Sequence, residues 1–377
     1  MANRYWVGGA NTWNTTAGTK WALTSGGAGG QTVPTTSDDV FFDGNSGAVI
    51  VAMTNDARAK NLSLNGFTGT INWSTVQGAQ IHGNLIGGAN ATISYSLGTG
   101  YISLQGTSIT HNITTNGMSW ISIYDEGTNS TISLQDTFYS IGRIQTTSNT
   151  IFTTNNYNLT FTGIIGTITV VSTGAVFNFG SSTLSTEIGW SFLTGCTVNA
   201  GTSTLKMVGT ANVSTFNGNG YTFYNVWFDK GASTQINRVD GNNTFNQLRD
   251  TGTAAHEFRI LNSSTQTMAD WAISGNPGAL ITIRSTSSTT THNLVKTGSG
   301  VVSADYLAIQ YSQASPASTW YAGTNSVDNT NNTGWIFTAP PAIGPANLKT
   351  YNTNLKANIK TINTNPIANV KSLDTNV

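Results

Sequence analysis

The segments LTFT (residues 159–162) and TITVV (residues 167–171) show the pattern that decides the fold. In both, apolar or β-branched residues alternate with threonine. The same alternation recurs in NLSL (61–64), ATISY (91–95) and LITIR (280–284). A period of two predicts β-strands with one buried face, and the glycines and asparagines between the segments predict tight turns.

Segments of this kind continue from residue 49 to residue 309, without a convincing helix. They recur about every 7 to 10 residues, so three strands would form a rung of roughly 20 to 28 residues. Stacked at about 4.8 Å, some ten to thirteen rungs would make a rod of about 50–60 Å. We therefore predict an all-β fold, a right-handed parallel β-helix (solenoid). The alternative is an antiparallel β-sandwich array, which should contain more two-residue Asn-Gly hairpin turns.

Composition changes along the chain predict four parts. Residues 1–48 form an aromatic- and glycine-rich N-terminal cap. Residues 49–310 form the β-solenoid body, and residues 311–338 form a closing C-terminal cap. Residues 339–377 form a linker and an extended repeat tail.

Tryptophans mark both ends of the predicted solenoid. Trp6, Trp13 and Trp21 lie in the N-terminal part, and Trp320 and Trp335 lie in the closing part. A buried aromatic side chain removes about 150–250 Å² of surface from water, so these residues are suited to cover the open ends of a stack. The alternative for the first three is an exposed platform for sugar rings.

The two ends of the chain also carry specific motifs, and together with a generic middle they resemble a broad, mostly uncharacterised group of phage and bacterial β-helical proteins. The resemblance covers roughly residues 3 to 337 and implies a β-solenoid found in virion fibres, decorations or adhesins, with no defined chemistry. Its motifs are Tyr5-Trp6-Val7-Gly8-Gly9, Thr12-Trp13, Gly26-Gly27-Ala28-Gly29-Gly30, Asp38-Asp39-Val40-Phe41-Phe42-Asp43, the segment 59–70, Thr319-Trp320-Tyr321-Ala322-Gly323, the segment 325–329 and Thr333-Gly334-Trp335-Ile336-Phe337.

Charge and targeting signals limit the classes of partner and the location that we expect for this protein. Only 8% of residues are charged, with 16 basic against 16 acidic, so clustered cations for nucleic acid are not expected. The single cysteine, Cys196, lies in an apolar run that predicts a small buried side chain. Met1 leads into Ala2-Asn3-Arg4 without the regions of a signal peptide, and no apolar run approaches the roughly 20 residues of a membrane helix. We expect synthesis in a host cytoplasm, no membrane insertion, and localisation on a virion surface.

Residues for hydrolytic chemistry are sparse. A glycan hydrolase needs two carboxylates facing one groove. The nearest approach to such a constellation is His256 and Glu257 with Asp250 and Arg259. The carboxylates of the body are scattered singly and favour solvated turn positions: Asp125, Glu126, Asp136, Glu187, Asp229, Asp240, Asp250, Glu257 and Asp270.

Metal and phosphate sites are not predicted either. Segments 43–47 and 328–332 could supply oxygen ligands for calcium, but Asx turns account for both. The glycines of segment 26–30 are not followed by the Lys-Ser/Thr of a phosphate loop. No histidine has a Cys or His neighbour at zinc spacing; the four are His82, His111, His256 and His292. We predict no catalytic residue, no cofactor and no metal ligand.

The tail contains an eleven-residue repeat in segments 347–357, 358–368 and 369–377. An eleven-residue period fits a right-handed coiled coil, but the Asn-Thr-Asn triplets and Pro366 favour extended segments with turns. The tail has too few apolar groups to order itself, so we expect it to bind neighbouring proteins or further copies of this chain. These assembly residues are Leu348, Tyr351, Leu355, Ile359, Ile362, Ile367, Val370, Leu373 and Val377.

The sequence therefore predicts a non-enzymatic bacteriophage structural protein exposed on the particle as a head decoration, head fibre or tail fibre. Its expected partners are other virion proteins, reached through the tail, and copies of itself in a homo-oligomer, with a trimer favoured. Host-surface glycans are a further candidate partner. Two alternatives remain open: a tailspike-type polysaccharide depolymerase and a bacterial surface adhesin.

Overall fold

The structure is a computed structural model of the whole chain, and it divides into two units, residues 1–338 and 339–377. The assembly residues of the tail, Leu348 to Val377, lie outside the described residues, so the expected conformation of the tail stays a prediction. The described residues are 2–73, 77–95, 100–146, 149–163, 167–170 and 173–341.

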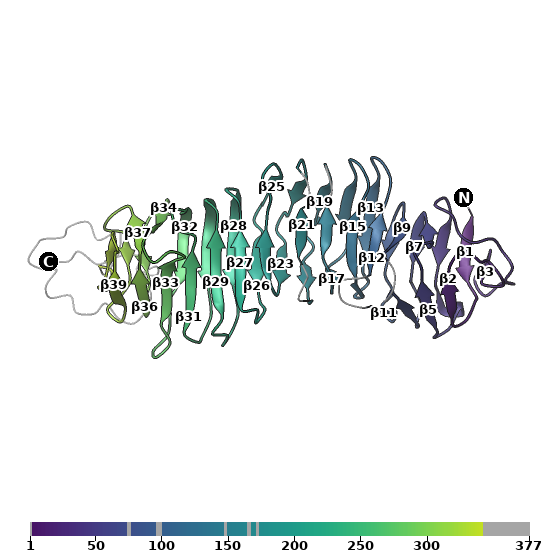
Figure 1. Cartoon of the computed structure of the whole chain (residues 1–377), viewed down its shortest axis with the longest axis horizontal. Helices are drawn as coiled ribbons and strands as arrows, with labels where there is room; N and C mark the ends of the chain where they lie inside the picture. Colours follow the sequence, from purple (N-terminus) through teal and green to yellow (C-terminus); the bar gives the residue numbers. More distant parts are fainter. Residues whose placement is uncertain are drawn as a thin grey trace, which may run out of the picture. The chain divides into compact units, whose positions relative to one another are not determined.

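The described residues between 2 and 338 form an all-β solenoid of about 12 turns, which confirms the predicted parallel β-helix (Figure 1). Strands of successive turns pair in parallel. The number of residues per turn varies: Ile132 pairs with Phe152, 20 residues on, and Leu85 pairs with Ile113, 28 residues on. The first turn is longer, since Asn3 pairs with Asp39. The antiparallel sandwich alternative is wrong.

In the described part of the chain, the strands form five sheets, which we number 1 to 5. Sheets 1 and 2 belong to the N-terminal part of the stack. The strands of sheet 1 are β1 (Asn3–Trp6), β3 (Trp21–Ala22), β4 (Asp39–Phe41), β7 (Asn61–Ser63), β10 (Leu85–Ile86), β13 (Thr110–Thr114), β16 (Thr131–Leu134), β19 (Ile151–Thr153), β22 (Val176–Asn178) and β25 (Thr197–Asn199). Those of sheet 2 are β2 (Asn11–Trp13), β5 (Ile50–Met53), β8 (Thr70–Asn72) and β11 (Thr92–Ser94).

Sheet 3 follows almost the whole stack, and sheets 4 and 5 complete it. The strands of sheet 3 are β6 (Arg58–Ala59), β9 (Gln77–Ile81), β12 (Tyr101–Leu104), β15 (Ser122–Asp125), β18 (Ile144–Thr146), β21 (Ile168–Val170), β24 (Gly189–Ser191), β27 (Val213–Asn217), β29 (Ile236–Asp240), β31 (His256–Ile260), β33 (Ile281–Ser285), β36 (Leu307–Gln310) and β39 (Val327–Thr330). Those of sheet 4 are β14 (Ser119–Trp120), β17 (Phe138–Ser140), β20 (Leu159–Phe161), β23 (Thr183–Thr186), β26 (Thr204–Met207), β28 (Thr222–Phe228), β30 (Asn243–Asp250), β32 (Thr265–Ile273), β34 (His292–Lys296) and β37 (Ser312–Ser315). Those of sheet 5 are β35 (Val302–Ser303), β38 (Trp320–Tyr321) and β40 (Trp335–Ile336).

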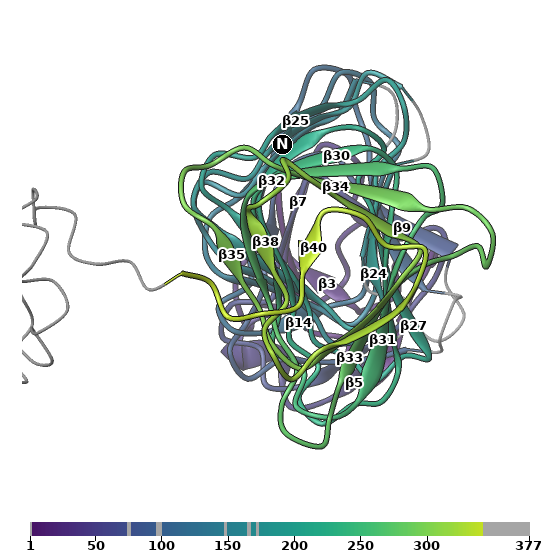
Figure 2. The same ribbon diagram turned by 90° about the vertical axis from the view of Figure 1, so that its left-hand side faces the viewer.

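From β4 on, each turn of the N-terminal part visits sheet 1, then sheet 2 or 4, then sheet 3, so three sheets enclose the interior (Figure 2). This order changes after β25, the last strand of sheet 1. The next turns contain β28, β30 and β32, which are seven to nine residues long. In each, two consecutive outward residues mark a bend, as at Tyr224 and Asn225 in β28. One bent strand thus replaces two short strands and the corner between them.

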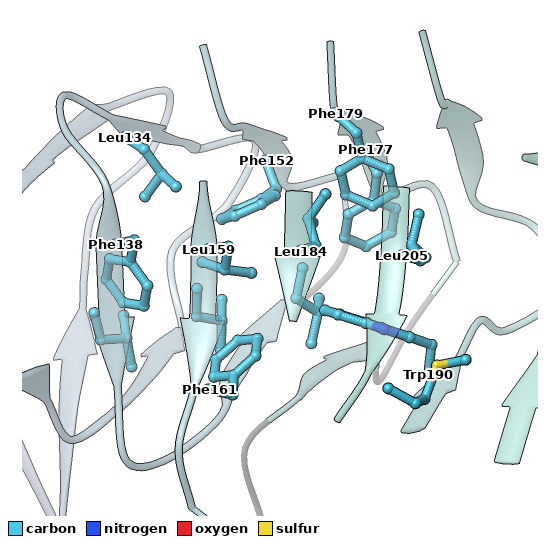
Figure 3. Packing of buried hydrophobic residues seen from close by; sticks show 14 of the residues in the cluster. Leu134, Phe138, Phe152, Leu159, Phe161, Phe177, Phe179, Leu184, Trp190 and Leu205 are labelled. Carbon is cyan, nitrogen blue, oxygen red and sulfur yellow. The ribbon is translucent and has the colours of Figure 1, made fainter. Parts of the chain in front are cut away.

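Inward side chains of successive turns stack into one apolar core. Ile132, Phe152 and Phe177 follow one another in register on sheet 1, and Leu159 and Leu184 do so on sheet 4. Figure 3 shows Phe152, Phe177, Leu159 and Leu184 in this core. All five are fully buried. Burial of such a side chain contributes about 1.5–3 kcal/mol, and the same strand positions are apolar in turn after turn. Hydrophobic burial therefore holds the stack together along its length.

Aromatic clusters lie at both ends of the described strands. Trp6, Trp13 and Trp21 are fully buried and pack against one another and Phe42, with ring centroids 5.0 to 6.2 Å apart. β3 pairs antiparallel with β1 and so occupies the outer edge of sheet 1. Burial leaves the three indole faces unavailable to sugar rings, against the platform alternative. Parallel pairing already begins in this head, between β1 and β4.

The opposite end is built in a similar way. Trp320 is fully buried, Trp335 is nearly so, and both pack edge-to-face against each other and Trp271. An open last turn would expose apolar core, and these rings occupy that place. That the tryptophans at the two ends are needed for folding stays a prediction.

Helix is almost absent from the described residues, where η1 (Gly44–Ser46) is a single 3₁₀ turn. No helix in this part of the chain is long and apolar enough to cross a membrane.

Candidate functional site

Several of the carboxylates singled out in the sequence are engaged in hydrogen bonds at separate places in the described stack. Asp125 points into the core, where Thr150 donates a 2.6 Å hydrogen bond to it. Asp136 accepts hydrogen bonds from the backbone of Thr115 and Asn116 at a turn. Asp270 accepts one from Gln247 on the outer face of sheet 4. These contacts stabilise turns and neighbouring rungs, and none presents a pair of carboxylates to a substrate.

The expected constellation around His256 is divided by the strand itself. β31 alternates, so His256 points inward while Glu257 and Arg259 point outward. Inside, His256 Nε2 lies 2.9 Å from Asp250 Oδ2, and both side chains are almost completely buried. Asn237 and the Gly252 amide donate further hydrogen bonds to Asp250, each 2.7 Å long.

The electrostatics of this buried pair favour a charged imidazole. Burial is the largest influence on His256 and works to lower its pKa, but the hydrogen bond and charge of Asp250 outweigh it and raise the pKa. Lys230 lies nearby, and burial lowers its pKa. The group is enclosed in the core, so it bridges strands rather than meeting a ligand.

The outward residues form a ladder of charges on sheet 3. Arg238, Arg259 and Arg284 pair in register on three successive turns. Glu257 bridges Arg259 and Arg284, and Asp240 pairs with Arg238. Like charges stacked at about 4.8 Å repel, so the two carboxylates offset most of the charge of the ladder.

Burial lowers the pKa of each of the three remaining histidines. His292 is fully buried, with neither ring nitrogen hydrogen-bonded in the described part of the chain, and burial lowers its pKa to about 3. Burial also lowers the pKa of His111, whose Nδ1 lies 2.7 Å from the Gly83 carbonyl, and of His82. No group of three His, Cys, Asp or Glu side chains suited to a metal ion occurs among the described residues.

The two candidate calcium segments and Cys196 make local contacts. Asp43 caps η1 by accepting a hydrogen bond from the Asn45 amide, which is an Asx turn. Asn332 donates a 2.7 Å hydrogen bond to Asp328. Cys196 is buried and its thiol contacts the Leu193 carbonyl, as expected for a small core side chain.

A groove without any counterpart in the sequence analysis lies beside β25. Because β25 ends sheet 1, its far edge has no strand of that sheet beside it. Residues of β25 and of the first half of β28 line one hollow there. The space between them has a volume of about 310 Å³. Its lining contains no charged residue and consists of Val198, Ala200, Gly201, Thr222, Phe223, Tyr224, Thr244, Phe245 and Asn246.

The groove combines an apolar floor with a polar rim. Phe223 and Phe245 are buried below it, and Thr222, Tyr224 and Thr244 stand exposed at its edge. The Tyr224 side chain is 36% exposed. Thr222 pairs in register with Thr244, so two hydroxyls lie on neighbouring strands.

A tyrosine brace fixes the two sides of this groove. Tyr221 precedes β28, and its hydroxyl donates a hydrogen bond of 3.0 Å to the Leu193 carbonyl. The Cys196 amide donates a 3.1 Å hydrogen bond to the same hydroxyl. Burial is the main cause that raises the pKa of Tyr221, so the phenol stays protonated and able to donate. The loop before β25 is thereby tied to the start of β28.

The nearby Trp227 is a contrasting case. Lys206 Nζ lies 4.0 Å from its ring centroid and the Arg249 guanidinium 4.4 Å. These cations come from the strands on either side of β28, so they cover both ring faces. Trp227 is therefore closed to a stacking ligand, whereas Tyr224 is not covered in this way.

Comparison with protein-family models, with curated proteins and with solved structures found no match for this chain.

Proposed function

We propose that this protein is a non-enzymatic structural protein exposed on the surface of a bacteriophage particle, as a head decoration, head fibre or tail fibre. The observation that carries the proposal is the stack of about 12 turns, with one core and an aromatic cluster at each end of the described strands. Such a stack is suited to hold an exposed surface away from its point of attachment. The resemblance of the end motifs to those of phage β-helical proteins supports the same assignment.

The disposition of ionisable groups supports a role without catalysis. General acid–base chemistry needs paired groups at a surface that substrate can reach. Here the pair of Asp250 with His256 is enclosed in the core, and Glu257 is engaged by two arginines.

Attachment is assigned to residues 339–377, and the tail is proposed to bind other virion proteins or further copies of this chain. Its lysines Lys349, Lys356, Lys360 and Lys371 against Asp374 favour an acidic receiving surface. A trimer would let three identical tails interdigitate their apolar positions.

Particle imaging tests this proposal. Gold-labelled antibody raised against residues 2–338 should decorate intact phage particles in electron micrographs, and particles lacking the protein should be unlabelled. Labelling confined to bacterial cells would instead support a surface adhesin. Shortening of capsular or cell-wall polysaccharide by the purified chain would identify a depolymerase and overturn the non-enzymatic assignment.

A further inference from the structure

We infer that the groove between β25 and β28 binds a neutral carbohydrate, with Tyr224 as the stacking surface. The inference concerns the purified chain and does not depend on its being part of a virion. It rests on four observations: the exposed ring, the uncharged lining, the volume of the groove and the brace that fixes its sides.

The first observation is the exposed ring of Tyr224. Outward positions of the described strands are mostly polar. Among the described residues, the aromatic side chains that rank with the most exposed large hydrophobic residues are Tyr157, in a turn, and Tyr224, in β28. Tyr224 lines the groove and Tyr157 does not. An aromatic face offers a sugar ring apolar contact, while the phenol keeps a polar tip in water.

The second observation is the uncharged lining of the groove. Thr222, Thr244 and Asn246 place hydroxyl and amide groups at the rim, and each hydroxyl can both donate and accept hydrogen bonds. Saccharide hydroxyls have the same double capacity. With no charged residue in the lining, an acidic sugar would gain no counter-charge here, so the chemistry matches a neutral ring.

The third and fourth observations are the volume of the groove and the tyrosine brace that fixes its sides. About 310 Å³ is at the lower end of small-molecule sites, which suits one part of an oligosaccharide rather than a large cofactor. The Tyr221 hydroxyl holds the loop before β25 against the start of β28, so the site is preformed and little ordering opposes binding.

An extended peptide added to the open edge of β25 is the competing occupant. β25 has only three residues, Thr197–Asn199. In the parallel ladder Thr197 donates toward the preceding turn and Asn199 accepts from it, so only Val198 directs its backbone groups to the open edge. One residue is too short a template for strand addition, which gains its affinity from a series of main-chain hydrogen bonds.

Saturation-transfer NMR on the full chain tests the inference, with maltotetraose, cellotetraose and chitotetraose as neutral probes. Tetragalacturonic acid is the acidic probe, and a seven-residue Thr-Val peptide tests strand addition. At least one neutral tetrasaccharide should bind in the millimolar range or better, and the other two probes should not. Failure of all three neutral probes at about 10 mM, or preference for the acid or the peptide, overturns the inference.

Substitutions then locate the site. Tyr224→Ala should weaken binding at least about tenfold, which corresponds to about 1.4 kcal/mol, and Tyr224→Phe should retain most of it. Thr244→Val should weaken binding while keeping side-chain shape. Tyr157→Ala is the matched control, an exposed tyrosine outside the groove, and should bind as the unmodified chain does. Equal affinity in Tyr224→Ala, with unchanged thermal unfolding, would place the ligand elsewhere and refute the assignment.

Discussion

Replacement of His292 by leucine should remove much of the acid sensitivity of this solenoid. The imidazole is fully buried between strands of sheet 4, and its pKa falls from an ordinary 6.5 to about 3 in the folded chain. A group whose folded pKa is lowered binds protons more readily when unfolded, so acid favours unfolding. His292 therefore leaves stability intact above pH 6.5 and reduces it as the pH falls toward 3.

The magnitude follows from the shift. The full difference of about 3.5 pH units corresponds to about 5 kcal/mol at 1.36 kcal/mol per unit, reached only below pH 3. At pH 5 the unfolded histidine is protonated and the folded one is not, which lowers the free energy of unfolding by about 2 kcal/mol relative to pH 7.5. Leucine lacks this titration and also removes two unpaired buried nitrogens.

Urea unfolding followed by tryptophan fluorescence at pH 7.5 and 5 measures the effect. The loss of stability between the two pH values should be smaller by about 2 kcal/mol in His292→Leu than in the unmodified chain. His82→Leu controls for loss of an imidazole, and should change the pH dependence less because that side chain is only partly buried. His256 acts in the opposite sense: its raised pKa contributes stability below pH 6.5 that is lost as the pH rises through the folded value. An unchanged pH dependence in His292→Leu would show that the imidazole is not held neutral in the core.

Three further perturbations have defined outcomes. Changing Trp6 and Trp13 together to serine should lower the free energy of unfolding by several kcal/mol, because one such truncation of a buried tryptophan costs about 3–5 kcal/mol. Size-exclusion chromatography should then show aggregation or loss of the folded species. A monodisperse and equally stable variant would contradict the capping role. Glu257→Gln should lower the free energy of unfolding by about 1 kcal/mol at low salt and by less in 1 M salt, because Arg259 loses its ion-pair partner; salt-independent stability would contradict this account. A chain ending at Phe337 should keep the β circular-dichroism spectrum and thermal stability of the full chain but fail to oligomerise or join particles, and normal assembly by that chain would refute the anchoring role of the tail.

The architecture was predictable because the core repeats. Alternation such as that of residues 159–162 identifies strands, and the spacing of strands predicts a turn length that the pairings of Ile132 with Phe152 and Leu85 with Ile113 confirm. The aromatic ends were also visible, since tryptophans cluster in sequence as well as in space. These features depend on local pattern, which a single sequence contains.

The groove could not be predicted, because it depends on a break in the inward–outward alternation of side chains within one strand. Phe223 and Val226 both point inward, so strict alternation cannot hold between them, and Tyr224 and Asn225 both face outward. The sequence shows only two adjacent aromatics and does not say which one is exposed. The strand pairing supplies the remaining information, because the same break in alternation recurs at Asn246 and Gln247 in β30.

The pairing of Asp250 with His256 was half visible. The sequence places Asp250 and His256 near each other, but it places Glu257 and Arg259 equally near, and β31 directs these two outward. Strict alternation along residues 256–260 places His256 on one face of the strand and Glu257 and Arg259 on the other, and the sequence alone shows this alternation. The contact of Asn237 with Asp250 was not, since it depends on how separate strands meet in the core.

The ladder of parallel strands also determines how this protein would respond to mechanical load. Hydrogen bonds between turns lie along the length of residues 2–338, so tension applied through the two ends of that unit loads them in series, and the weakest interface between turns yields first. Releasing a turn of 21 residues, as between Leu184 and Leu205, frees roughly 70 Å of extended chain. Pulling should therefore give a train of separate extensions of unequal length, one for each turn, rather than a single rupture.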